Sequence, residues 1–219
     1  MNNALRPGLS FCRLGERYMF LDLASDRYFC LRGHAEAAFA RAYNGLILSA
    51  LDQQFLTKAG ILVPEGGLPI RECHTSPAVD DFAPADMPRA KAWQLICGLV
   101  LNTAAGAQLK TFGLARTIRR LARRKTRAAG IPTGCDEPQR LLSIATGVLS
   151  ANRLLGAQGR CLPNSLALAH RLLTHGIAPE LILGVKLAPF EAHAWVQCGR
   201  WILGDACENT RKFTPILVV

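Results

Sequence analysis

The C-terminal quarter of the chain constrains the fold more narrowly than any other part. Residues 162–175 have the apolar pattern of a helix, which Gly176 ends, and short apolar segments separated by turn signals follow it. We expect strands in these segments, at residues 180–187, 191–197, 201–204 and 213–219. A helix followed by consecutive short strands predicts an α+β domain with an antiparallel sheet.

The first 70 residues form a separate pattern. Two strand-like segments, residues 18–23 and 28–31, flank a turn signal and predict a hairpin, which a short strand at residues 9–14 precedes. Helices are expected at residues 34–43 and 49–58. Proline and glycine are then frequent, so we divide the chain into a domain at 1–70, a linker at 71–90 and a domain at 91–219. The second domain is expected to begin with helices at 89–129 and 137–155.

Charge is unevenly distributed along the chain, whose formal net charge is +10. The excess is concentrated in Arg116–Arg127, where Leu114, Ile118 and Leu121 fall on one helical face and basic residues surround the rest. This helix is either a solvated face or a docking face for an acidic peptide, a partner enzyme or an anionic membrane. The N-terminal domain lacks a basic reading helix, so no nucleic-acid partner is expected.

Targeting signals and cofactor motifs are not found. No apolar run is long enough for a membrane span and no signal-peptide pattern is present, so a cytoplasmic protein is expected. The eight cysteines are scattered without a C-x-x-C pair, which predicts neither zinc nor a disulfide framework. Most thiols are expected to be buried apolar groups. No cofactor is predicted.

One cysteine has the context of a nucleophile. Cys161 directly precedes the predicted helix, whose free N–H groups and dipole favour a thiolate and could hold an oxyanion. A nucleophilic thiol needs a base, and the base needs an orienting acceptor. His193 lies in a predicted strand and Asp205 follows the next one. His170 and His175 lie too far along the helix of Cys161 to reach the thiol.

Whether His193 and Asp205 can meet depends on the register of the predicted hairpin that connects them. If Gln197 faces Trp201, His193 and Asp205 are directly opposed on one face of the sheet. If Cys198 faces Trp201, Asp205 points away from His193 unless a bulge intervenes. The triad therefore requires the first register, or an irregularity in the second.

The same residues carry a family resemblance. RCLPNSLALAHRLLTHGI at Arg160–Ile177, LILGV at Leu181–Val185, PFEAHAWV at Pro189–Val196 and WILGD at Trp201–Asp205 resemble the B proteins of lasso-peptide biosynthesis. The resemblance implies a papain-related, transglutaminase-like fold and a leader peptidase, with Cys161 as nucleophile, His193 as base and Asp205 as orienting group. Gln158, upstream of Cys161, is a candidate oxyanion donor by analogy with papain-like enzymes.

The resemblance also implies binding partners. The N-terminal domain resembles the small winged-helix-like domain that binds a precursor's leader as an added β-strand. The expected leader-binding residues lie in the second hairpin strand: Arg27, Tyr28, Phe29, Cys30 and Leu31. The resemblance implies an ATP-dependent macrolactam synthetase as the partner enzyme. This chain has no nucleotide-binding motif, so ATP chemistry is assigned to that partner.

Two other functions fit the sequence. A transglutaminase-type acyl transferase would use the same triad with an amine in place of water. A non-catalytic scaffold would only present the precursor to another protein, and its activity would not depend on Cys161.

Overall fold

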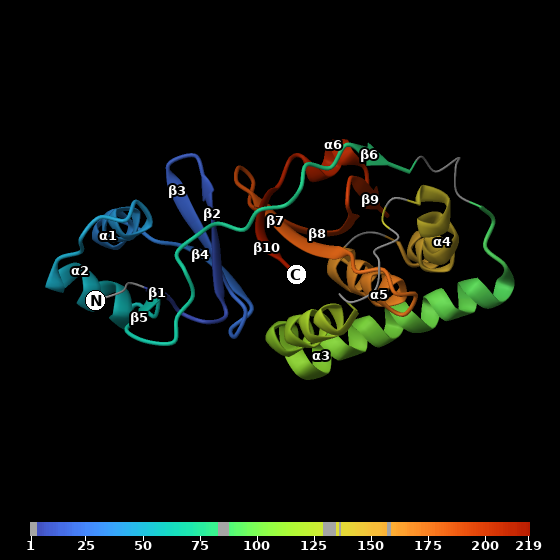
Figure 1. Ribbon diagram of the computed structural model, residues 1–219, viewed down its shortest axis with the longest axis horizontal. Helices are drawn as coiled ribbons and strands as arrows, with labels where there is room; N and C mark the ends of the chain where they lie inside the picture. Colours follow the sequence, from blue (N-terminus) through green and yellow to red (C-terminus); the bar gives the residue numbers. More distant parts are fainter. Residues whose placement is uncertain (1–3, 83–87, 129–134, 136, 157–158) are drawn as a thin grey trace. The chain divides into compact units, whose positions relative to one another are not determined.

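The computed structural model describes residues 4–82, 88–128, 135, 137–156 and 159–219, and the chain forms two compact units, Met1–His74 and Thr75–Val219 (Figure 1). The α+β class expected from the sequence is confirmed. No helix within the described ranges is long and apolar enough to cross a membrane.

The first unit is built on a three-stranded antiparallel meander. Strands β2 (Leu9–Leu14), β3 (Arg17–Asp22) and β4 (Arg27–Cys30) pair in that order, and β1 (Ala4–Leu5) pairs with β5 (Leu62–Val63). Helices α1 (His34–Tyr43) and α2 (Ala50–Lys58) complete the unit, and Ser49 begins α2 with a capping box. Phe11, Phe20 and Phe39 meet in the core with ring centroids 4.8–5.8 Å apart.

Three long helices form one part of the second unit. α3 (Ala92–Ala128) lies along α4 (Pro138–Leu155) and α5 (Cys161–Leu173), and is kinked at Gly113. Two glycines allow a close approach of α3 and α4: a Cβ on Gly98 would lie 2.2 Å from the Gly147 carbonyl oxygen, and a Cβ on Gly147 would lie 2.4 Å from that of Gln94. Substituting either glycine would force the two helices apart.

The second unit also contains a five-stranded sheet, in the order β10-β7-β8-β9-β6. Its strands are β6 (Asp80–Asp81), β7 (Glu180–Lys186), β8 (Glu191–Cys198), β9 (Trp201–Leu203) and β10 (Thr214–Val218). A four-residue helix, α6 (Cys207–Thr210), lies between β9 and β10. The expected sheet was entirely antiparallel, but β6 pairs with β9 in parallel, so the sheet is mixed.

Strand β6 comes from the segment expected to be a linker. Val79 and Asp80 donate their N–H groups to the Arg200 carbonyl, and the Arg200 Nε lies 2.6 Å from an Asp80 carboxylate oxygen. Phe82 stacks on Trp201 with centroids 4.9 Å apart. The proline and glycine content of this segment predicted a linker. The segment is instead held on the sheet by contacts with residues that are distant from it in sequence.

The cysteine pattern predicted no disulfide framework, but the structure has one disulfide. Cys135 and Cys198 form a disulfide, with Cα atoms 5.3 Å apart and a sequence separation of 63. Cys198 ends β8 at the turn, and a Cβ on the adjacent Gly199 would lie 3.6 Å from that of Cys135. The pairing arises from the tertiary approach of the segment before α4 to this turn, which cysteine spacing does not reveal.

Candidate active site

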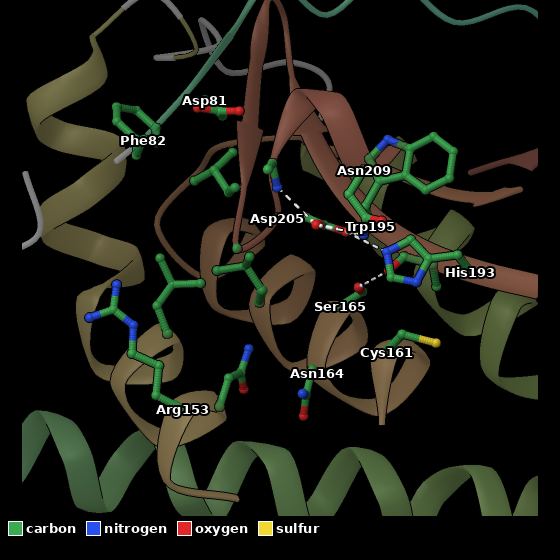
Figure 2. A pocket seen from close by; sticks show the side chains of 17 residues that line it. Asp81, Phe82, Arg153, Cys161, Asn164, Ser165, His193, Trp195, Asp205 and Asn209 are labelled. Carbon is green, nitrogen blue, oxygen red and sulfur yellow. Dashed lines mark hydrogen bonds and ion pairs between the residues drawn. The ribbon is translucent and has the colours of Figure 1, made fainter. Parts of the chain in front are cut away.

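The thiol of Cys161 lies at the start of α5 (Figure 2). The first hydrogen bond of this helix runs from the Asn164 N–H to the Arg160 carbonyl, so the N–H groups of Cys161 and Leu162 precede the helical ladder. Because these N–H groups and the positive end of the helix dipole lie at the start of α5, they stabilise a thiolate here. The sequence expected Cys161 just before the helix, whereas it is the first helical residue.

The electrostatics of Cys161 differ from those of the other thiols. Burial alone would raise its pKa, but hydrogen bonds from His193 and from the backbone of Ala194, and the charge of His193, lower it overall. Burial instead raises the pKa of Cys12 to about 12 and that of Cys73 to about 11. The surroundings of Cys161 therefore favour its thiolate, which is the nucleophilic form, whereas those of Cys12 and Cys73 favour the thiol.

The imidazole of His193 is held by two aromatic rings. His193 lies on β8 opposite Gly184 of β7, with ring centroids 6.1 Å from Trp195 and 5.1 Å from Phe213. Gly184 makes room for this arrangement, because a Cβ there would lie 2.7 Å from the Trp195 ring. The β7–β8 pairing and the aromatic packing thus fix the plane of the imidazole.

The ring of His193 is bonded to a carboxylate and lines the same cavity as the thiol. Its Nε2 is bonded to Asp205 Oδ2, which leaves Nδ1 for Cys161. The hydrogen bond to Asp205, followed by the one to Cys161, raises the pKa of His193 to about 9. Burial opposes the charge on Asp205, but bonds from His193, Asn209 and the Ala206 N–H bring the pKa of Asp205 below its usual value. This arrangement favours a thiolate–imidazolium pair.

The register between β8 and β9 is the one that requires an irregularity. Cys198 faces Trp201 and Gln197 faces Ile202, so strand alternation alone would point Asp205 away from His193. The strand ends at Leu203, however, and Gly204 has φ +80°. This left-handed residue turns the chain and returns Asp205 to the side of His193.

Asn209 is a site residue that the sequence reasoning missed. Its side-chain N–H groups donate to both oxygens of Asp205, at 3.0 and 3.3 Å, and the Ala206 N–H donates to Oδ1 at 2.8 Å. Figure 2 shows Asn209 and His193 beside the Asp205 carboxylate. The spacing of four residues from Asp205 was the available signal, but the short helix α6 that uses it was not predicted.

Asn209→Ala is expected to lower turnover without unfolding the protein. Without these hydrogen bonds the Asp205 carboxylate is less well oriented toward His193. The transition state should lose about 1 kcal/mol of stabilisation, which lowers kcat/KM roughly five- to tenfold. Catalytic rate and thermal midpoint are measured together, with exposed Glu208→Ala as the neighbouring control. An unchanged rate in Asn209→Ala would show that the carboxylate is held without it.

A cavity of about 570 Å³ adjoins the three groups. Leu149, Leu168 and Leu203 supply much of its apolar lining, and Arg153 and Phe82 also line it. Ser165 donates to the Ala194 carbonyl at 2.9 Å and so ties α5 to β8 where Cys161 and His193 meet. The nucleophile, the base and the carboxylate all border this space, which is large enough for a few peptide side chains.

The other candidate site residues lie elsewhere. Gln158, the candidate oxyanion donor, lies outside the described residues. The expected leader-binding segment is in the first unit: Arg27–Cys30 forms β4, which within the described strands pairs only with β3, and Leu31 after it is buried. Across the described residues, no group of three His, Cys, Asp or Glu side chains could hold a metal ion.

Comparison with known proteins identifies the family of the second unit. The family described as the transglutaminase-like superfamily matches residues 99–218, which is more than half of the chain and includes Cys161, His193 and Asp205. No curated protein and no solved structure matches the chain.

Proposed function

Because the chain belongs to the transglutaminase-like superfamily, we propose that it is a cysteine endopeptidase that removes the leader from a ribosomally made lasso-peptide precursor. Membership of the superfamily supports thiol chemistry of the cysteine-protease or acyltransferase type. The observation that carries the proposal is the His193–Asp205 pair beside Cys161, whose pKa is lowered. The finer assignment rests on the sequence resemblance around Cys161 and His193.

The proposed reaction passes through a thioester. The Cys161 thiolate attacks the scissile carbonyl carbon, and the N–H groups at the start of α5 stabilise the oxyanion. The His193 imidazolium then protonates the leaving amine, which becomes the N-terminus of the core peptide. Neutral His193 next takes a proton from water as the water attacks the thioester. The leader leaves with a free carboxylate, and the Cys161 thiolate and the imidazolium are restored.

Asp205 acts on this reaction through His193. Its bond to Nε2 keeps Nδ1 directed at the thiol and stabilises the positive ring. Asn209 and the Ala206 N–H hold the carboxylate in turn. Gln158 remains a proposed oxyanion donor.

For the first unit we propose leader recognition by strand addition. The meander ends at β4, whose second edge pairs with no other described strand, and in this proposal the leader adds there as an extended strand. Binding there, in a winged-helix-like domain, would raise the effective concentration of the scissile bond at Cys161. The proposed partners are the precursor leader and an ATP-dependent macrolactam synthetase that closes the ring.

The proposal is tested by incubating the full-length protein with a precursor encoded by a short reading frame beside its gene. Mass spectrometry should show two fragments whose masses sum to the precursor plus one water. An adduct with an added amine would instead indicate an acyl transferase. An intact precursor would contradict both, and cleavage that survives loss of the Cys161 thiol would indicate a scaffold for another enzyme.

Leader binding at β4 predicts an effect of proline on this edge. Alternate residues of a strand direct their N–H groups to opposite edges, so one of Arg27→Pro and Tyr28→Pro removes an N–H from the open edge. That variant should keep its thermal midpoint and bind a fluorescent leader peptide about tenfold more weakly, because one strand hydrogen bond is lost and the proline ring hinders the pairing beside it. Unchanged affinity in both variants would remove β4 as the leader site.

A further inference from the structure

The outward face of α3 beyond the kink is a strongly basic surface of the second unit. Arg116, Arg119, Arg120 and Arg123 recur at helical spacing on this face and are all exposed. Leu114, Ile118 and Leu121, on the opposite face, are buried. We call the four arginines and Phe112 the arginine hollow, because together they line a hollow of about 290 Å³.

The helix that carries the arginine hollow has no acidic residue of its own. Between Ala92 and Ala128 the 37-residue helix has eight Lys and Arg side chains and no Asp or Glu. No ion pair within the described ranges involves a hollow arginine. A helix that faced only solvent gains from alternating charges, whereas like charges at this spacing repel one another. An anionic partner would therefore relieve the repulsion among the arginines of this face.

Two neighbouring cations on other faces of the same helix are used within the protein. Arg124 Nη1 lies 3.3 Å from His170 Nδ1, and Lys125 Nζ donates to the Val219 carbonyl at 3.1 Å. In contrast, the Arg120 guanidinium lies over the Phe112 ring, 5.2 Å from its centroid. This stacking orders the Arg120 guanidinium beside the Phe112 ring.

We propose that the arginine hollow docks an acidic segment of a partner polypeptide. Guanidinium groups pair bidentately with carboxylates, and four of them around a concave surface match several Asp or Glu side chains on one segment. A lipid surface fits less well, because an interfacial helix inserts its apolar face, and here Leu114, Ile118 and Leu121 already pack in the core. Docking here is independent of the reaction at Cys161.

Binding of a fluorescein-labelled polyglutamate peptide to the full-length protein tests this proposal by anisotropy. Arg119→Gln/Arg123→Gln should weaken binding about tenfold, because two charge-assisted pairs are lost. The matched control is Arg89→Gln/Lys91→Gln, which removes the same charge from exposed positions before α3 and should change affinity by less than about twofold. Both variants leave the residues around Cys161 unchanged.

Three outcomes would overturn the proposal. Equal weakening in the two double variants would mean that net charge alone attracts the peptide. Absence of binding by the wild-type protein at low salt would mean that the hollow does not accept carboxylates. Binding to phosphatidylglycerol vesicles that requires Arg119 and Arg123, without binding to the peptide, would assign the face to an anionic membrane.

Discussion

Cys161→Ala is expected to abolish precursor cleavage, with a loss of about 10⁴-fold or more in turnover, because no other group in the proposed reaction can form the covalent intermediate. The cavity beside the thiol is otherwise unchanged by the loss of one sulfur atom, so precursor affinity should be retained. Single-turnover assays with excess enzyme, followed by mass spectrometry, separate these two quantities.

The control for this variant is Cys97→Ala. Cys97 is an exposed free cysteine on α3 and has no role in the proposed reaction. Its replacement should leave turnover within about twofold of wild type, as surface substitutions usually do. Equal losses in the two variants, or full activity in Cys161→Ala, would be incompatible with a nucleophile at position 161.

His193→Gln is expected to have the second-largest effect, a fall in turnover of about 10³- to 10⁴-fold. Glutamine cannot carry the proton to the leaving amine, and it removes the positive ring that lowers the pKa of Cys161. The residual activity should also require more alkaline conditions, because the thiol then ionises nearer its ordinary pKa. The matched control is His175→Gln, an exposed histidine beyond the end of α5.

The two pKa shifts predict how the activity of the wild-type protein changes at low and at high pH. Activity should persist below the ordinary range of a thiol, since the pKa of Cys161 is lowered, and should fall as pH rises through about 9, where His193 loses its proton. The two groups titrate as a coupled pair, so the limbs belong to the pair. A profile that rises steadily through about 9 would contradict an imidazolium as the proton donor.

Local patterns predicted most of the elements. Leu9–Leu14, His34–Tyr43 and the strand beginning at Glu180 match the structure because period and turn signals are properties of neighbouring residues. The order of Cys161, His193 and Asp205 along the chain indicated a triad, but it left open whether Asp205 lies on the side of His193.

The remaining features depend on contacts that neighbouring residues do not encode. Asp81 reaches the site region by pairing β6 with β9, and accepts a hydrogen bond from the Cys207 N–H. The turn at Gly204 brings Asp205 to His193 against the strand alternation, through a positive φ that only the folded chain defines. The Cys135–Cys198 disulfide similarly required knowledge of which segments are adjacent in space.

Competitive alkylation of the six free cysteines tests the central claim most directly, because it needs no substrate. The native protein is treated briefly with limiting iodoacetamide at mildly acidic pH, and peptide mapping measures the modified fraction at each cysteine. The account predicts that Cys161 reacts first in the wild-type protein and loses this advantage in His193→Gln. Faster modification of exposed Cys97 than of Cys161, or reactivity of Cys161 that does not depend on His193, would contradict an activated thiolate at the start of α5.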